Sequence, residues 1–176
     1  MKIKDLFPKF NVPVRLSSSI PYYGQYWDNK DMIILNPRLM KKLPGCAKFI
    51  FLHEMIHSTA HGKRLMRFQR LENNFGEYTV GSMAHKTEEC IAEVASMVAA
   101  MKLGLLNEYS QNIIFQGLEQ HYSKGMYIPV REIRAAVMYF AKDGVSFEEE
   151  IQEVKFILES HMDIKFQDTY NKRESA

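Results

Sequence analysis

The segment His53-Glu-Met-Ile-His57 carries the strongest signal in this sequence, and it lies within the run Phe49-Ile-Phe-Leu-His-Glu-Met-Ile-His-Ser-Thr-Ala-His-Gly62. Two histidines four residues apart on a helix lie one turn above each other, with Cβ atoms about 5–6 Å apart. That spacing lets both imidazoles bind one ion at about 2.0–2.1 Å, the bond length that zinc prefers. Glu54 is rotated by about 100° around the helix axis. It is therefore expected to act as general base on a water at the open coordination position.

The residues around the two histidines predict a helix with one buried side. Apolar and small residues fall together on a helical wheel: Phe49, Leu52, Ile56, Thr59 and Ala60. Pro44 and Gly62 mark the start and the end of this helix. The two histidines lie at the edge of the apolar side, where they can face a site. The alternative is a helix that carries two half-buried histidines and binds no metal.

Length and composition indicate a single domain, residues 1–176, whose core needs no disulfide staple. No apolar run approaches the roughly 18 residues that a membrane-spanning helix requires. The N-terminus, Met-Lys-Ile-Lys-Asp, lacks the apolar segment of a signal peptide. Cys46 and Cys90 form no Cys-x-x-Cys pair, so both are predicted to be small core residues. These features favour a cytoplasmic location.

The charge is nearly balanced, with 23 basic and 21 acidic residues, but it is unevenly distributed. Basic residues outnumber acids among the first fifty: Lys2, Lys4, Lys9, Arg15, Lys30, Arg38, Lys41, Lys42 and Lys48. A basic half can attract an acidic substrate or nucleic acid. It can equally be an ordinary solvated surface, and charge alone supports nothing more specific.

The pattern of elements predicts an α+β protein that is mostly helical, with a small N-terminal antiparallel sheet. Two β-favouring runs, 22–27 and 32–35, are joined by the turn sequence Asp28-Asn-Lys-Asp31 and predict a hairpin. Further helices are predicted over residues 36–43, 87–103, 107–122, 129–142 and 146–160, and residues 65–78 are predicted to form a short helix followed by a loop. The 146–160 helix starts with a capping-box pattern, Ser146-Phe-Glu-Glu149.

A catalytic zinc site needs a third protein ligand besides the two histidines. His61 is about 12 Å from His53 along a straight helix, so one ion cannot bind both; His61 is a helix-end residue or a rim group. Glu89 and Glu93 share one face of the 87–103 helix. We expect Glu89 to bind the ion and Glu93 to accept the free ring N–H of a ligating histidine. Glu88 is the alternative ligand, and all three acids could instead be a solvated first turn.

The chain also resembles a known family, the zincin-like metallopeptidase domain of ArdC-type antirestriction proteins and of polyvalent proteins in phages and conjugative elements. The resemblance covers about residues 20–142, with a helical C-terminal extension to about 165. The residues that carry it are Tyr26-Trp-Asp-Asn-Lys-Asp-Met-Ile-Ile-Leu-Asn-Pro37, His53-Glu-Met-Ile-His-Ser-Thr-Ala-His61, Arg64-Leu65, Arg67, Phe75-Gly76, Glu88-Glu-Cys-Ile-Ala-Glu93 and Leu103-Gly104.

This resemblance implies a zincin fold, a bound Zn²⁺ ion and a glutamate of the Glu88–Glu93 segment as third ligand. It also implies a phage or mobile-element origin and action inside a bacterial cell. Ala60 replaces a common glycine of the family, and His85-Lys86 replaces a common Tyr-Ala; both differences concern substrate preference more than the metal. DNA binding is not carried over, because it belongs to a separate N-terminal domain of larger members.

The sequence therefore predicts a zinc metallopeptidase of the HExxH, gluzincin-like type that cuts a protein or peptide, with a bacterial host defence protein as one target. Strand 32–35 is expected to be the sheet edge that pairs with an extended peptide. Candidate transition-state or rim groups are His61, His85 and Tyr109, with Tyr122 and Tyr127 as further oxyanion donors. The alternative is a zincin-fold binding protein that blocks a host factor stoichiometrically and does not need Glu54. A nucleic-acid-binding accessory is the third and weakest interpretation.

Overall fold

The protein was analysed as a computed structural model, which describes residues 1–170. Its helices are α1 (Ile3–Leu6), α2 (Pro37–Met40), α3 (Ala47–Thr59), α4 (Arg67–Phe75), α5 (Met83–Lys102), α6 (Glu108–His121), α7 (Val130–Tyr139) and α8 (Glu148–Met162), with a short 3-10 turn η1 (Asp28–Lys30). Its strands are β1 (Val14–Leu16), β2 (Gly24–Trp27), β3 (Met32–Leu35), β4 (Ile128–Pro129) and β5 (Phe166–Gln167). The predicted α+β, mostly helical class is confirmed.

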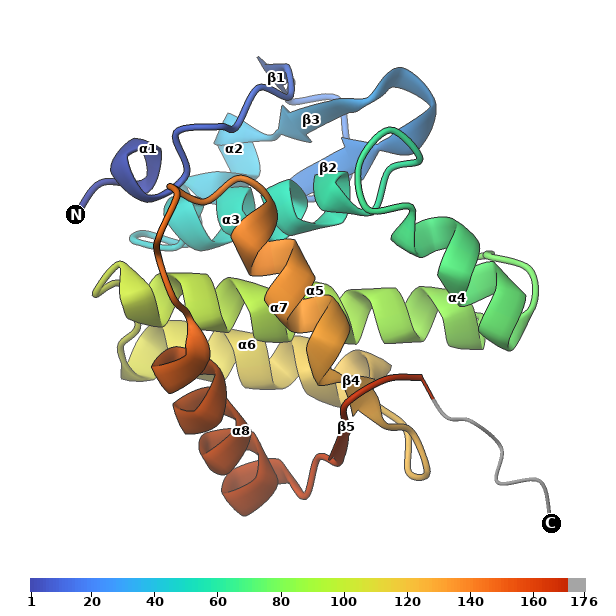
Figure 1. The fold of residues 1–176 in the computed structure, drawn as a ribbon. Coiled ribbons are helices and arrows are strands. Elements are labelled where there is room, and N and C mark those ends of the chain that lie inside the picture. The colour runs from blue at the N-terminus through green and yellow to red at the C-terminus, as the bar shows by residue number, and fades with distance from the viewer. Residues whose placement is uncertain (171–176) are drawn as a thin grey trace, which may run out of the picture.

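Helix α3 lies between the small sheet and helix α5, as Figure 1 shows. Its apolar side is buried as predicted, with Leu52 and Ile56 both fully inaccessible. Small residues on the facing helix let α5 approach closely: Ala92, Ser96 and Ala100 are all buried. Cys46 and Cys90 are buried, unpaired core residues, as predicted. The two helices that carry the candidate ligands are therefore packed directly against each other.

Helix α5 begins one turn earlier than the sequence pattern predicts. The expected start was residue 87, whereas the helix begins at Met83 because the Ser82 side chain accepts the backbone N–H of His85 as an N-cap. The additional turn brings His85 onto the same helix as Glu89. Since residues four apart share a face, His85 lies one turn above Glu89.

The N-terminal sheet is mixed, so the prediction of a purely antiparallel sheet was wrong. The predicted hairpin is present, and β2 pairs antiparallel with β3. Strand β1 pairs parallel with the other side of β3, with Val14 opposite Ile33 and Leu16 opposite Leu35. A strand of three residues with exposed side chains gives no period-two burial pattern, and for that reason the sequence did not indicate it.

The strand order β1-β3-β2 also corrects the predicted substrate-binding edge. Strand β3 is central and paired on both sides, so it cannot accept another strand. The open edge beside α3 belongs to β2. Gly24 brings this strand close to α3, because a Cβ atom at that position would lie 2.8 Å from Ile50 Cγ2 and 3.1 Å from Glu54 Cγ.

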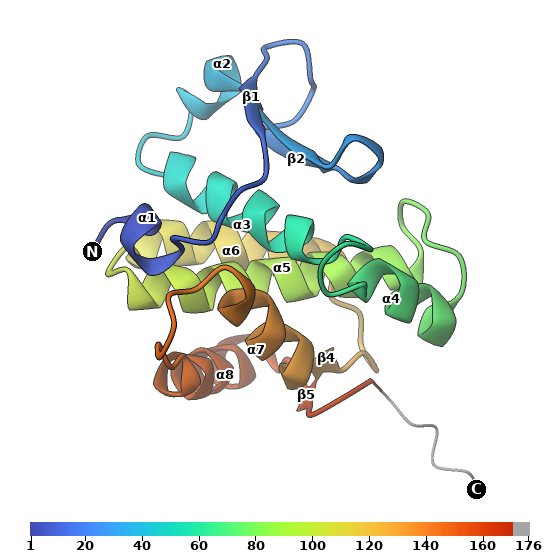
Figure 2. The same cartoon turned by 45° about the horizontal axis from the view of Figure 1, so that its top comes forward.

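The C-terminal half wraps the side of α5 that α3 leaves free. Helices α6, α7 and α8 all contact α5, and Figure 2 shows them on the side of α3 opposite to the sheet. Phe147 is the N-cap of α8, so the predicted capping box is not the start of that helix; the Ser146 hydroxyl accepts only the N–H of Glu148. Strands β4 and β5 form a short parallel pair that the sequence did not predict. Within residues 1–170, no helix is both long and apolar enough to cross a membrane.

Candidate metal centre

Three ligand atoms converge where α3 faces α5. The Nε2 atoms of His53 and His57 are 2.9 Å apart. The Glu89 carboxylate lies 3.3 Å from His53 Nε2 and 3.4 Å from His57 Nε2. One ligand atom from each of these residues lies within 4.8 Å of the other two, close enough for one ion to touch all three. The side chains keep 17%, 9% and 19% of their surface exposed, so the three residues are mostly buried but retain some contact with solvent.

The Nδ1 atoms of both histidines, which point away from the ligand triangle, face carboxylates. His57 Nδ1 is 2.9 Å from Glu88 Oε1, and His53 Nδ1 is 3.3 Å from Glu93 Oε1. With its proton on Nδ1, His57 donates to Glu88 and His53 has Glu93 beside it, and the Nε2 lone pairs are directed at the shared point. This is the usual arrangement of histidines that bind metal. Glu93 occupies the position beside a ligating histidine that the sequence suggested for it.

Glu88 lies on the outer side of His57 and does not reach the three ligand atoms. Its carboxylate is fully buried and forms a two-point pair with Arg67, at 2.7 Å from Nε and 2.9 Å from Nη2. Burial by itself raises the pKa of Glu88, but the charge of Arg67 and hydrogen bonds from His57 and Arg67 bring the pKa below its ordinary value. Arg67 was among the residues that carry the family resemblance, but the sequence gave it no role at the site, because a basic residue after a helix ordinarily lies on the surface.

Glu93 fits its position because the facing residue of α6 is a glycine. A Cβ atom on Gly117 would lie 2.6 Å from Glu93 Oε1 and 2.9 Å from its Cδ. Helix α6 can therefore approach α5 at the level of His53 without displacing the carboxylate. The sequence gives no local sign of this contact, which joins two different helices.

Gly117→Ala is expected to weaken zinc binding without unfolding the protein. The new methyl group would push the flexible end of Glu93 away from His53 Nδ1, and losing such a partner costs about 10–100-fold in metal affinity. Helix propensity favours alanine over glycine by about 1 kcal/mol, which limits the cost to stability. The measurement is zinc affinity by competition with a chromophoric chelator, beside thermal unfolding. Gly62→Ala is the control, since a Cβ atom there meets nothing within 4 Å. Equal affinities of the two variants would contradict the role of Gly117.

The Glu54 carboxyl is buried beside the ligand triangle, at 7% residue exposure. Burial raises its pKa, whereas His53, His57 and a hydrogen bond from the Tyr26 backbone act in the opposite direction. Tyr26 belongs to β2, so the edge strand touches Glu54 directly. The Tyr26 phenol donates a hydrogen bond to Asp31 and accepts one from Arg64. Arg64 also donates to the Ser58 carbonyl at the end of α3. Strand, turn and metal helix are thus fixed to one another.

Within residues 1–170, His85 is the one of the three predicted transition-state or rim groups that lies beside the ligands. Its Nδ1 accepts the N–H of Gly81 at 3.1 Å, so the neutral ring carries its proton on Nε2. Nε2 is 3.5 Å from Glu89 Oε1 and so presents a donor to the site. Gly81 adopts a φ of +82°, a conformation that an L side chain rarely takes.

The other two predicted groups lie elsewhere. His61 follows the end of α3, where its Nδ1 accepts the Lys63 N–H and its Nε2 is 3.9 Å from Asp28. Tyr109 is half exposed and lies at the start of α6, beside the C-terminal end of α5. The opposite end of α6 brings in a residue that was not predicted: His121, whose ring centroid is 5.6 Å from that of His85.

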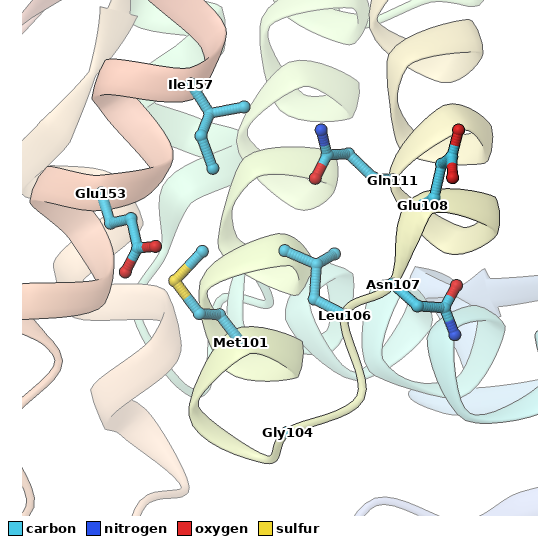
Figure 3. A pocket seen from close by; sticks show the side chains of 8 residues that line it. All are labelled: Met101, Gly104, Leu106, Asn107, Glu108, Gln111, Glu153 and Ile157. Atoms are coloured by element: carbon cyan, nitrogen blue, oxygen red, sulfur yellow. The ribbon is translucent and has the colours of Figure 1, made fainter.

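A separate pocket of about 410 Å³ opens at the far end of α5, away from the ligand triangle. Figure 3 shows its lining, which mixes apolar side chains with scattered acids and amides: Met101, Gly104, Leu106, Asn107, Glu108, Gln111, Glu153 and Ile157. Tyr109 borders the adjoining hollow. This lining offers no histidine or cysteine, so the pocket has no transition-metal donor set of the kind found at the α3–α5 face.

The charges at the centre predict how zinc binding depends on pH. Burial alone would lower the pKa of both ligating histidines, but Glu93 and Glu89 raise the pKa of His53 to about 9, and Glu89 and Glu88 raise that of His57 as well. Both shifts favour the protonated rings, so zinc and protons compete for the two Nε2 atoms. Zinc affinity should therefore rise with pH up to about 9, with protons released as the ion binds. Calorimetry in buffers of different ionisation enthalpy measures this release, and binding without proton release would contradict the prediction.

Comparison with protein-family models matches residues 2–115 to the family described as "Zincin-like metallopeptidase". The matched segment is about two thirds of the chain and includes the histidine pair, Glu54, Glu89 and Arg67. It begins and ends earlier than the expected range of 20–142, so α1 and β1 lie inside it, whereas Gly117, His121, α7 and α8 lie outside. Comparisons with curated proteins and with solved structures gave no match.

Proposed function

Because this chain belongs to the zincin-like metallopeptidase family, we propose that it is a zinc-dependent peptidase that hydrolyses peptide bonds in a protein substrate. The observation that carries the proposal is the convergence of His53, His57 and Glu89 on one point, with the Glu54 carboxyl beside them. A purely structural zinc site has four protein ligands and no need of a general base. This centre offers three ligands and a buried carboxyl.

The donor set fits zinc. Two imidazole nitrogens and one carboxylate oxygen, with a fourth position left open, are the ligands of one main class of catalytic zinc sites. His53, His57 and Glu89 would hold the ion, and Glu93 and Glu88 would fix the two rings. When bound, zinc polarises a carbonyl group and lowers the pKa of water.

Glu54 is the proposed general base. Its carboxyl is buried, and burial raises its pKa toward the range in which a group can both take and return a proton. In the proposed reaction Glu54 accepts a proton from water as the new C–O bond forms. It then passes that proton to the amine nitrogen as the C–N bond breaks.

We propose β2 as the strand along which the substrate lies, in place of β3. The backbone groups of Ile33 and Leu35 point to β1, so those of Ile34 point to β2 and pair with Gln25. Gly24 and Tyr26 therefore direct their backbone groups away from the sheet. The Tyr26 N–H is taken by Glu54, so an extended peptide would pair with Gly24 and the Tyr26 carbonyl and pass directly beside Glu54.

His85 is the proposed donor to the oxyanion. Its Nε2–H faces the ligand carboxylate of Glu89, and the Gly81 N–H holds the ring in the donating tautomer. Removing one donor of this kind costs about 10²–10³-fold in kcat in other hydrolases. The position is occupied by histidine here, where the resembled family commonly has tyrosine.

The resemblance to antirestriction and polyvalent proteins supports a biological setting for this peptidase. We propose that it comes from a phage or mobile element and acts in the cytoplasm of a bacterial host on a defence protein. Proteomic comparison of host cells that express the parent chain or its Glu54→Gln form tests this. New N-termini in one or a few host proteins are expected with the parent alone, and they should not form where zinc is chelated before the parent meets its substrate. Identical N-terminal profiles in both cultures would contradict a proteolytic function.

A further inference from the structure

The ligand His57 is supported by the ion pair of Arg67 and Glu88, which does not itself reach the three ligand atoms. Arg67 and Glu88 are both fully buried. A buried ion pair is costly to desolvate, and apolar residues of similar size often give equal or greater stability. The pair therefore calls for an explanation beyond stability, and its contacts supply one.

All donor groups of the Arg67 side chain are directed at the two ligand helices. Nε and Nη2 bind the two oxygens of Glu88 on α5. Nη2 also donates to the Ile56 carbonyl at 3.0 Å, and Nη1 donates to the Thr59 hydroxyl at 3.0 Å, both on α3. Ile56 immediately precedes His57 in the chain. The Arg67 guanidinium thus binds α3 on both sides of His57, at Ile56 and Thr59. It also binds Glu88 on α5, the residue that His57 Nδ1 contacts.

The Glu88 carboxylate has no freedom to rotate in this arrangement. Oε2 is held by Arg67 alone, whereas Oε1 accepts from both Arg67 Nη2 and His57 Nδ1 at 2.9 Å. Because the guanidinium is planar and rigid, its two-point bond fixes the plane of the carboxylate. That plane in turn fixes the orientation of the His57 ring. Glu93, which supports His53, is instead fitted against Gly117.

We infer that Arg67 is a positioning residue for the metal centre, which acts through Glu88 to hold His57 in its ligating orientation. The inference rests on the proposed function only in requiring zinc at this site. Since a histidine support of this kind is worth about 10–100-fold in metal affinity, loss of the two-point bond should weaken zinc binding within that range.

The chain offers a matched control on the same helix. Arg70 forms a two-point pair with Glu132 on α7, with both distances at 2.8 Å, and contacts none of the metal-binding residues. Arg67→Lys and Arg70→Lys each keep the positive charge and lose the planar fork. Zinc affinity by chelator competition, and thermal unfolding of the metal-free protein, are measured for both. We expect Arg67→Lys to weaken zinc binding by about 10-fold or more and Arg70→Lys to leave it unchanged.

A double-mutant cycle tests whether Arg67 acts through Glu88. Glu88→Gln alone should weaken zinc binding, and adding Arg67→Lys to it should produce little further loss, because both changes break the same link. Folded Arg67→Lys with parental zinc affinity, or losses that simply add in the double variant, would overturn the inference. If the lysine variant does not fold, unchanged zinc affinity in Glu88→Gln overturns it equally. A parent chain that binds zinc but cuts nothing would refute the peptidase and leave this inference standing.

Discussion

The Glu54→Gln variant is expected to retain its zinc and its fold while losing peptide-bond cleavage. Glutamine has the size of glutamate and can still hydrogen-bond a water, but it cannot accept that water's proton. General-base catalysis is worth about 10²–10⁴-fold, so the loss should be clear in any assay that detects the parent. Zinc content, thermal unfolding and cleavage are measured on the same preparations. Glu119→Gln, the same substitution at an exposed position of α6, is the control and should behave as the parent.

The same pair of proteins separates a peptidase from a stoichiometric blocker. If the protein protects a phage or plasmid by cutting a host factor, protection should disappear with Glu54→Gln. If it only binds that factor, protection should persist at full strength with zinc retained. The second result would exclude proteolysis as the explanation of its biological role, even if weak cleavage were measurable in a purified system.

Removal of a ligand should have the largest effect on metal content. We expect about one zinc per parent chain and none after His53→Ala or His57→Ala, since the two remaining ligands cannot hold the ion in a catalytic site. His161→Ala is the control, because that histidine lies on α8, where its Nδ1 contacts the Ile157 carbonyl. Metal analysis of dialysed protein measures the difference. Full zinc occupancy in the variant that lacks both His53 and His57 would show that the zinc site is not on α3.

Glu89→Ala and Glu88→Ala should fail in different ways. Glu89→Ala removes a ligand and should release zinc while the metal-free protein stays folded. Glu88→Ala leaves Arg67 buried without its partner, and such a loss typically costs about 3–5 kcal/mol of stability. Its zinc affinity, measured on the folded fraction, should fall only by about 10–100-fold. The opposite order of zinc loss would make Glu88 the ligand and require α5 to be rotated by about 100°.

The sequence alone determined the relations between residues that it placed on the same helix. The four-residue spacing fixes His53 above His57 and Glu89 above Glu93, and the rotation per residue directs Glu54 differently from the two histidines. The same rules identified α3 and most of the other helices, because their buried faces repeat with the helical period. His85 was a candidate from the sequence, but its place one turn above Glu89 required the Ser82 cap to be recognised.

Only the tertiary structure decided the relations between elements. Whether Glu88 or Glu89 faces the histidines depends on how α5 is rotated against α3; the sequence favoured Glu89 with Glu88 as the alternative, and the packing of the two helices brings Glu89 to both rings. Arg67 became part of the site because a charge can be buried only where partners from other elements surround it, here Ile56, Thr59 and Glu88. The open sheet edge at β2 likewise depends on β1 adding to β3 from the other side. Local periodicity describes the neighbours within an element, whereas packing brings together residues that no spacing rule connects.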